Sequence, residues 1–332
     1  MTNLIRAGLA FALAAAQLCA QAQPAAFDLQ GHRGARGLLP ENTLPGFAMA
    51  LGIGVTTLEL DIAISKDREL FISHDPYLNP DITRGPDGKF LEARGPLILS
   101  LTAQQVQGYD VGRIKMLVPY ARTFSDQKPV DGARIPRLKE LFDLVRKSGN
   151  EHVQFAIETK VFPHDPGATL DPEEFTKLLL AEVREAGMEK RVSIISFDWR
   201  TLQVVKRDAP TIPTVYITMQ RPQSIDNIGA DNPQGSAWTA GFQFKDYGSV
   251  PKMIKAAGGH TWSAFWRDLD AAKVKEAQSL GIKVLAWTIN DSATMSQLMN
   301  MGVDGIVTDR PDLLRAEMQK RGMPLPRATP VN

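Results

Sequence analysis

The chain has 332 residues, of which 43% are hydrophobic and 23% charged, and it contains 26 Gly, 22 Pro and one Cys. This composition excludes a collagen-like, low-complexity or disulfide-stapled protein. The 38 Lys and Arg residues nearly balance the 37 Asp and Glu residues, so a strongly basic nucleic-acid-binding surface is excluded as well. The length suits two medium domains or one large α/β domain.

Residues 1–22 are expected to be a secretory signal peptide. Arg6 precedes an apolar run over 7–16, and Ala20-Gln21-Ala22 follows. A run of this length is too short to span a bilayer, which needs roughly 20 residues. A positive start, a short apolar run and a small-x-small site indicate cleavage after export. A tethering or unstructured N-terminus is the alternative.

Cys19 raises the possibility of a lipoprotein, but Leu18 is bulky where such a signal needs a small residue. Simple cleavage before Gln23 is therefore favoured. It removes 22 of the 332 residues and leaves 310, with no Cys. The expected protein is periplasmic or secreted, with no transmembrane segment in the mature chain.

Short β-rich segments alternate with helical patterns along most of the chain. The segments with strand character are 29–33, 56–64, 69–74, 153–160, 192–197, 214–219, 261–266, 283–289 and 305–309. The clearest amphipathic helical patterns are 135–145, 172–186, 199–207, 270–280 and 292–301. This alternation predicts a parallel sheet covered by helices.

The segments 56–64 and 69–74 are too close in sequence to be parallel neighbours. A parallel crossover needs a dozen or more residues, so this pair is expected to be an antiparallel hairpin. The remaining eight strands predict an α/β fold, a (β/α)8 TIM barrel, in a single domain over 23–332. A doubly wound open sheet is the alternative, but no glycine-rich nucleotide loop follows the first strand to support it.

Residues 76–134 interrupt the alternation and are expected to form an insertion after the hairpin. They are rich in turn-forming residues, with one short helical stretch near 102–108. A connection this long usually performs a function or has ordered structure of its own. Because it follows His74 directly, we expect it to border the mouth of the site.

Carboxylates alternate with apolar residues along two predicted barrel strands. Glu59 and Asp61 share one face of the second strand, and Glu158 and Lys160 share one face of the segment 153–160. The apolar faces pack against helices, so the polar faces are expected to point into the barrel. Crowded like charges need compensation. A hard cation, Ca²⁺ or Mg²⁺, would provide it, and so would an ion-pair cluster with Lys160.

Two of the five histidines are expected at the same end of the barrel. His32 ends the first predicted strand, and His74 ends the second arm of the hairpin. TIM-barrel active sites lie at the carboxyl ends of the strands, and imidazoles exchange protons near neutral pH. A lone histidine there is more often structural, but two beside a carboxylate cluster favour acid–base catalysis. Of the other three, only His164 is a candidate for the rim.

Short motifs occur in a characteristic order along nearly the whole predicted mature chain. They are His32-Arg33-Gly34, Pro40-Glu41-Asn42-Thr43, Glu59-Leu60-Asp61, His74-Asp75, Glu158-Thr159-Lys160, Trp287-Thr288-Ile289-Asn290 and 302–311. Each motif alone is weak, but the ordered set is specific. With it, the chain resembles the glycerophosphodiester phosphodiesterase family, of the exported bacterial type.

The resemblance implies a (β/α)8 barrel with an insertion, and hydrolysis of small glycerophosphodiesters to glycerol 3-phosphate and an alcohol. It also implies one bound divalent cation, Ca²⁺ or Mg²⁺, and so favours the metal over the ion-pair cluster. The residues that match the family's site positions are His32 and His74 for catalysis, Glu59, Asp61 and Glu158 for the metal, and Arg33, Lys160 and Trp287 for the substrate.

These residue types suit phosphodiester chemistry. Arg33 offers a planar donor fork and Lys160 a point charge to the phosphate. The basic leaving alkoxide needs a proton from one histidine, while the other removes a proton from the attacking hydroxyl. The sequence does not say which of His32 and His74 does which, nor whether water or the glycerol's own hydroxyl attacks. Trp287 offers an apolar wall for glycerol, with core packing as the alternative.

Two positions depart from the family's pattern. Asp67-Arg68 stands where Asp-Gly is usual, and we expect this to alter only the hairpin turn. Arg137 stands where a small hydroxyl residue is common before a helix, away from the chemistry.

Two further residues leave a structural alternative open. Asn42 is expected either to cap the following helix or to contact the site. Asp309 is expected either to anchor Arg33 or Lys160 or to cap the final helix.

Two other functions remain in competition at this stage. One is a phospholipase D-like enzyme acting on lysolipids or sphingolipids, for which 97–99 and 116–118 are candidate apolar residues at the mouth. The other is a non-catalytic exported binding protein. The sequence indicates neither the head-group preference nor the oligomeric state.

Overall fold

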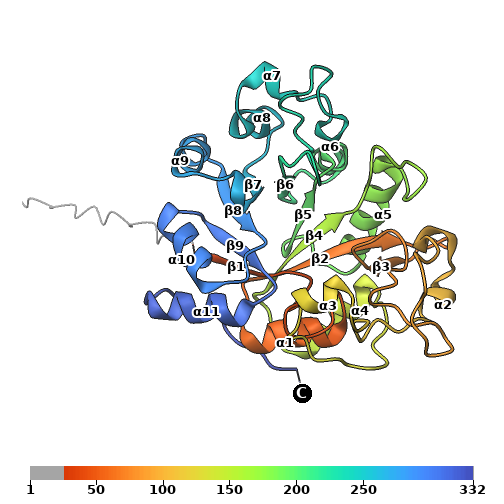
Figure 1. Ribbon diagram of the computed structural model, residues 1–332. Coiled ribbons are helices and arrows are strands. Elements are labelled where there is room, and N and C mark those ends of the chain that lie inside the picture. Colours follow the sequence, from red (N-terminus) through yellow and green to blue (C-terminus); the bar gives the residue numbers. More distant parts are fainter. Residues whose placement is uncertain (1–25, 332) are drawn as a thin grey trace, which may run out of the picture.

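The computed structural model describes residues 26–331, so the expected signal peptide lies outside the described residues. One sheet has the strand order β1-β9-β8-β7-β6-β5-β4-β2-β3, and pairing of β1 with β2 closes it. The strands are β1 Asp28–Gly31, β2 Thr57–Ile64, β3 Leu70–Ile72, β4 Gln154–Thr159, β5 Val192–Ser196, β6 Thr214–Thr218, β7 Thr261–Phe265, β8 Lys283–Trp287 and β9 Gly305–Thr308. Of these nine strands in residues 26–331, only β2 and β3 pair antiparallel. The closed parallel ring confirms the barrel and excludes the open sheet (Figure 1).

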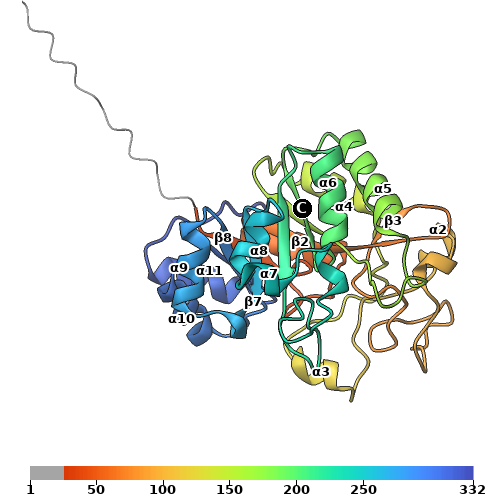
Figure 2. The same cartoon turned by 90° about the horizontal axis from the view of Figure 1, so that it is seen from above.

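Helices surround the ring of strands (Figures 1 and 2). They are α1 Leu44–Ile53, α2 Ala103–Val106, α3 Pro119–Thr123, α4 Leu138–Lys147, α5 Pro172–Glu185, α6 Trp199–Asp208, α7 Phe244–Tyr247, α8 Val250–Ala256, α9 Ala271–Ser279, α10 Ser292–Met301 and α11 Pro311–Lys320, with short 3₁₀ turns η1 Ile98–Ser100, η2 Ala237–Thr239 and η3 Trp266–Asp268. Within residues 26–331, none is long and apolar enough to cross a membrane.

Two helices differ from the sequence pattern for identifiable reasons. The helix expected from residue 135 begins at Leu138, because Arg137 is extended at φ −76° and ψ 155°. Ile135 packs in the insertion's own apolar cluster instead. Helix α1 shows no amphipathic pattern, because its sequence, LPGFAMALGI, carries no charged residue and so has no polar face.

Alternate residues along each barrel strand face opposite sides. Phe155 and Ile157 lie in the main core with helical side chains, and the Phe155 ring meets that of Phe142 in α4 at a centroid distance of 5.1 Å. Ala156 lies in a separate small cluster inside the barrel with Ile195 and Leu285. Polar side chains that share the inner face are therefore directed toward the axis of the barrel, above this small cluster.

The insertion after β3 contains η1, α2 and α3 and has its own small apolar cluster, which includes Phe71 of β3. Helix α2 lies within the stretch expected to be helical. The Asp67 carboxylate accepts a hydrogen bond from the Ala103 N–H at 2.9 Å and so ties the hairpin turn to α2. Arg68 has φ +67°, in the left-handed region that favours glycine, which fits the Asp-Gly usual in the family.

Candidate active site

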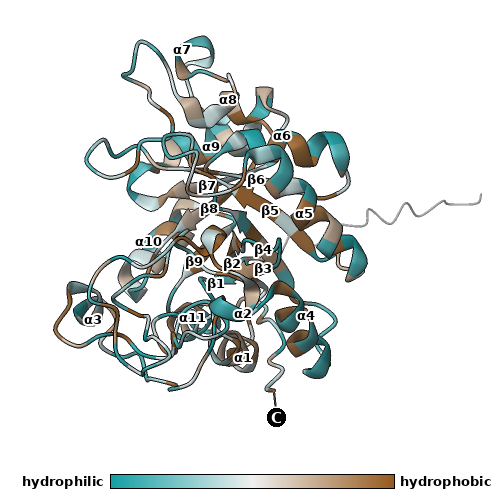
Figure 3. Ribbon diagram, turned by 90° about the vertical axis from the view of Figure 1, so that its right-hand side faces the viewer, coloured by the Kyte–Doolittle hydropathy of each residue, from teal (hydrophilic) through white to brown (hydrophobic). Residues whose placement is uncertain are grey.

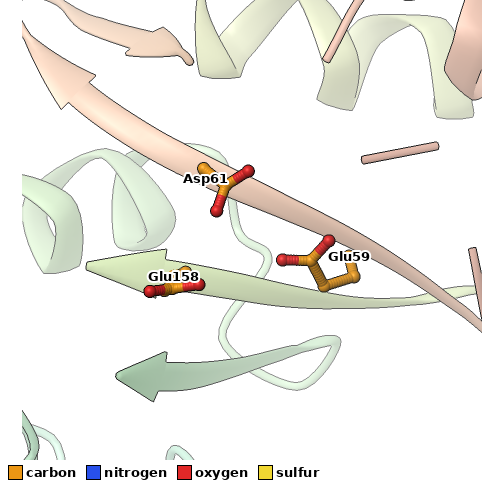
Figure 4. A group of neighbouring side chains, drawn as sticks. All are labelled: Glu59, Asp61 and Glu158. Atoms are coloured by element: carbon orange, nitrogen blue, oxygen red, sulfur yellow. The ribbon is translucent and has the colours of Figure 1, made fainter. Parts of the chain in front are cut away.

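Three buried carboxylates meet inside the barrel. Glu59 and Asp61 project from β2 and Glu158 from β4, and Asp61 is directly opposite Glu158 in the parallel pairing. One oxygen from each of the three lies within 4.8 Å of the others (Figure 4). The period-two alternation of the strands thus brings the three predicted metal ligands together.

Charge in this cluster is only partly compensated. Burial, together with the charges of Asp61 and Glu158, holds the pKa of Glu59 well above its ordinary value. Burial also raises the pKa of Glu158 to about 7. Burial would raise the pKa of Asp61 too, but the positive charge of Lys160 and its other cationic neighbours hold it well below its ordinary value.

Two cations lie against the carboxylates. Lys160 Nζ is 3.0 Å from Asp61 Oδ1 and 2.8 Å from Glu158 Oε1. Arg33 Nε is 3.4 Å from Asp61 Oδ2, and its Nη1 donates to Glu41 Oε1 at 2.7 Å. Both side chains line the pocket and are fixed there by these carboxylates.

Glu59 is the least compensated of the three carboxylates. Its Oε2 accepts the backbone N–H of Arg33 at 2.8 Å, while the His32 Nε2 stands 3.8 Å away. Asn42 donates to Asp61 Oδ2 at 2.9 Å, and its own buried Oδ1 has no hydrogen-bond partner. Three converging carboxylate oxygens with a charge deficit on one side fit a hard divalent cation such as Ca²⁺ or Mg²⁺.

His32 is held by a carboxylate from the other end of the chain. Its Nδ1 lies 2.7 Å from Asp309 Oδ1. Asp309 also accepts hydrogen bonds from Arg36 Nε at 2.7 Å and from Asn290 Nδ2 at 2.6 Å. Burial, followed by the charge of Arg36, lowers the pKa of His32 to about 3. The imidazole is therefore neutral here, and its Nε2 faces the carboxylates.

His74, which also lines the pocket, has a similar arrangement. Its Nδ1 lies 2.9 Å from Asp75 Oδ1, and Asp75 Oδ2 accepts from Asn79 Nδ2 at 2.7 Å. Burial and the charge of Arg33 lower the pKa of His74. A carboxylate on Nδ1 leaves Nε2 as the ring nitrogen available for chemistry on both histidines.

The site opens into a pocket of about 290 Å³ with two unlike halves. One half is charged and contains His32, Arg33, Arg36, Glu59, His74, Glu158 and Lys160. The other half is mainly apolar. There Trp287 packs between Phe197 and Phe265, with ring centroids 5.5 Å apart in each case, and lines the pocket. The pocket thus offers fixed charges to one end of a ligand and an apolar wall to the other.

The sequence profile of the Glycerophosphoryl diester phosphodiesterase family matches residues 32–313. The chain belongs to this family. It is 27% identical over 291 residues to the glycerophosphodiester phosphodiesterase of Caldanaerobacter subterraneus, covering 88% of this chain and 97% of that one.

Solved structures show the same fold. A Silicibacter pomeroyi protein assigned to the same family is 32% identical, with a TM-score of 0.80 and coverage of 91% of this chain and 96% of the other. An Oleispira antarctica phosphodiesterase in complex with the product sn-glycerol-3-phosphate is 21% identical, with a TM-score of 0.63 and coverage of 87% and 96%.

Two expectations about this family member's residues need correction. Asp309 contacts neither Arg33 nor Lys160, because Arg33 turns toward Glu41; Asp309 binds His32 and Arg36 instead. It does not cap α11 either, since Arg310 occupies that position.

Helix α1 is capped by Thr43, whose Oγ1 accepts from the Gly46 N–H at 3.2 Å. Asn42 is therefore not the cap, and its side chain contacts the site through Asp61. His164 is exposed beside Trp238, with ring centroids 6.0 Å apart, and does not line the pocket.

Sequence reasoning missed Arg36 and the roles of Asp75 and Asn290 as partners of the site. Arg36 lines the pocket and binds Asp309, and its only sequence signal is its position four residues after His32. Asp75 directly follows His74, so the motif His74-Asp75 could have predicted the hydrogen bond between these two side chains. Asn290 lies in the motif after β8, where its side chain reaches Asp309 at the end of the neighbouring strand β9.

Proposed function

We propose that this protein hydrolyses glycerophosphodiesters to glycerol 3-phosphate and an alcohol, using a bound divalent cation and acid–base catalysis by His32 and His74. The observation that carries the proposal is the meeting of two carboxylate-held imidazoles with three buried acids in one pocket. Membership of the family supports the substrate class.

Glu59, Asp61 and Glu158 would hold the cation. When bound there, it supplies positive charge to a non-bridging phosphoryl oxygen as negative charge builds up in the transition state. Ca²⁺ and Mg²⁺ both suit three carboxylate oxygens. The raised pKa of Glu59 supports this assignment, because burial and two neighbouring carboxylates already disfavour its charge without a cation.

The protein's own groups supply the remaining chemistry. Arg33 and Lys160 bind and orient the phosphodiester anion. One imidazole takes a proton from the attacking hydroxyl of water, or of the glycerol itself, through Nε2. The oxygen–phosphorus bond to the alcohol breaks, and the second imidazole, in its protonated form, gives a proton to the departing oxygen. Where the glycerol hydroxyl has attacked, the product of this step is a cyclic phosphate, which water then opens to glycerol 3-phosphate.

Asp309 and Asp75 direct the two rings. A carboxylate that accepts the Nδ1–H selects the tautomer in which Nε2 carries the lone pair, and it stabilises the imidazolium once a proton has been taken up. Trp287 provides an apolar surface against the carbon backbone of the glycerol.

We also propose that the protein is exported. The charge at Arg6, the apolar run over 7–16 and the small residues around Gln21 support this. Mass spectrometry of the protein from its host would show a mature chain that starts at Gln23; a chain that retains residues 1–22 would contradict the proposal.

A product assay tests the proposed reaction. Purified protein with CaCl₂ or MgCl₂ is expected to release glycerol 3-phosphate from glycerophosphocholine. Release of phosphocholine instead would show cleavage of the other phosphodiester bond and contradict the proposal. Tight binding of the intact diester without hydrolysis, across several head groups and metals, would favour the non-catalytic binding protein.

A second candidate activity is phospholipase D-like cleavage of lysolipids. The apolar half of the pocket, with Trp287 and Phe197, favours it. Of the apolar runs considered for this role, Ile98 is buried within the insertion, while Met116 and Leu117 are exposed. Comparing lysophosphatidylcholine with glycerophosphocholine decides the matter: faster release of choline from the lysolipid would favour the second activity.

A further inference from the structure

Met116 and Leu117, in the insertion, are by far the most exposed large apolar side chains of residues 26–331, at 77% and 89%. The other exposed side chains of this kind, such as Leu325 at 37%, reach at most 38%. Single exposed apolar residues are common, but two adjacent side chains exposed to this degree place a continuous apolar area in water. Leu117 also has φ +66°, a backbone region that disfavours leucine. Packing within the protein does not explain either feature.

The segment that carries these residues, which we call the tip (115–118), is held firmly at both ends. At its first residue, the Lys115 N–H donates to the Asp81 carbonyl at 2.7 Å. After it, the buried Phe124 ring lies under the Arg36 guanidinium, 4.5 Å from its centroid. Gln127 Nε2 also donates to the Arg36 carbonyl at 2.7 Å. The apolar side chains are therefore presented on a fixed base.

The tip stands on the same face of the barrel as the pocket. Arg36, which supports the segment after the tip, also lines the pocket and binds Asp309. Figures 2 and 3 show α3, which directly follows the tip, standing away from the barrel strands. A surface that received the tip would therefore lie in front of the catalytic mouth.

Positive side chains outnumber acidic ones around the tip, and the nearest following acid, Asp126, is paired with Arg310 at 2.8 Å. Residues 113–125 contain Arg113, Lys115 and Arg122 and no Asp or Glu. Arg113 is paired with Asp131 at 2.7 Å, and the half-buried Lys115 donates from its Nζ to the Leu91 carbonyl at 3.3 Å, while Arg122 is exposed on α3. Exposed apolar side chains flanked by cations are what an anionic lipid surface binds, because the apolar groups enter the bilayer and the cations meet its head groups.

We propose that the tip inserts Met116 and Leu117 into the surface of an anionic phospholipid bilayer, with Lys115 and Arg122 at the lipid head groups. This orientation turns the pocket toward the membrane, where phosphodiesters derived from lipids are released. The contact is a surface property that is independent of the proposed reaction.

Vesicle sedimentation tests the proposal with the full chain and its variants. The wild-type protein is expected to bind vesicles of phosphatidylglycerol and phosphatidylcholine, to bind pure phosphatidylcholine more weakly, and to lose binding as salt is raised. Leu117→Asn should weaken binding about tenfold. Asn is well tolerated at positive φ, so the melting temperature should not fall. Lys115→Gln and Arg122→Gln should each weaken binding to the anionic vesicles about fivefold.

Leu325→Asn is the matched control. Leu325 is also exposed, but it lies beside Phe27 and Val55, which precede β1 and β2, at the other end of the barrel. This variant should bind vesicles like the wild type. Hydrolysis of soluble glycerophosphocholine by Leu117→Asn should also match the wild type, because the tip does not line the pocket.

The proposal is overturned if the wild type does not bind anionic vesicles at low salt, or if Leu117→Asn binds them as well as the wild type does. Sedimentation equilibrium separates a different occupant. A wild-type dimer that Leu117→Asn dissociates, without vesicle binding, would show that the tip contacts a second copy of the chain and that the lipid proposal is wrong.

Discussion

His32 and Asp309 are 277 residues apart in the sequence, yet His32 Nδ1 lies 2.7 Å from Asp309 Oδ1. The contact exists because β1 and β9, the first and last strands in the sequence, pair in parallel within the closed barrel, with Gly31 opposite Thr308. His32, which follows β1, and Asp309, which follows β9, therefore lie side by side at the carboxyl ends of the two strands. Barrel closure thus orients one of the two proposed catalytic imidazoles.

Asp309→Asn should reduce kcat about 10²-fold and leave KM nearly unchanged. The amide removes the negative charge that stabilises the imidazolium and allows the wrong ring tautomer. The measurement is steady-state release of glycerol 3-phosphate. Asp312→Asn is the control, because Asp312 pairs with Arg310 at 2.8 Å and does not line the pocket. Equal activity of Asp309→Asn and the control would refute an orienting role for Asp309.

Glu59→Gln should abolish turnover of glycerophosphocholine without loss of fold. Because burial and neighbouring carboxylates hold the pKa of Glu59 well above its ordinary value, a neutral amide should not lower the melting temperature of the metal-free protein. Thermal melting with and without CaCl₂ or MgCl₂ checks this. The wild type should be stabilised by the metal and the variant should not; an equal stabilisation of both would exclude Glu59 as a ligand.

Lys160→Met separates a metal site from a structural ion-pair cluster. Lys160 lies between Asp61 and Glu158, so its loss leaves buried carboxylates without their cation and should cost about 3–5 kcal/mol of stability in metal-free protein. At a metal site, added CaCl₂ or MgCl₂ should restore much of that stability. Lys177→Met is the control, since Lys177 forms an exposed pair with Glu173 at 2.8 Å. Failure of either metal to rescue Lys160→Met would favour the ion-pair cluster.

Glu182→Gln should stabilise the protein increasingly as pH rises. Burial raises the pKa of Glu182 in α5 to about 7, and its buried Oε1 has no hydrogen-bond partner. The folded state therefore prefers the protonated carboxyl. Its favourable contribution is complete below the unfolded pKa and is lost as pH rises through about 7.

Denaturant unfolding at pH 5 and pH 8 measures this effect. The gain in Glu182→Gln should be small at pH 5 and on the order of 1–2 kcal/mol at pH 8, after allowing for solvent screening of a partly exposed group. Glu185→Gln, exposed on the same helix, is the control. A gain that did not change with pH would contradict the raised pKa.

Local patterns predicted the inner wall of the barrel. The alternation around Glu59 and Asp61 depends only on the period of a strand, so it was visible without any partner strand. Helix α1 has no such pattern because all its faces are apolar. The choice between Asn42 and Thr43 as the cap of α1 depended on the backbone conformation of Asn42. Asn42 has φ +53°, and its side chain is turned toward Asp61.

Contacts that depend on closure of the barrel could not be predicted in the same way. Asp309 was expected near Arg33 or Lys160, because the site residues all lie at the same end of the barrel. The sequence does not show which of these side chains are in contact. In the structure Arg33 donates to Glu41, while Asp309 binds His32 and Arg36. Arg36 was missed for the same reason, since its partner Asp309 comes from the last strand.

The metal requirement is the most direct test of the proposed chemistry. The wild-type protein is treated with excess EDTA and dialysed, and release of glycerol 3-phosphate from glycerophosphocholine is measured before and after CaCl₂ or MgCl₂ is added. Activity should disappear on chelation and return as about one divalent cation per chain is bound. Undiminished release in excess EDTA, by protein that contains no divalent metal, would contradict a cation held by Glu59, Asp61 and Glu158.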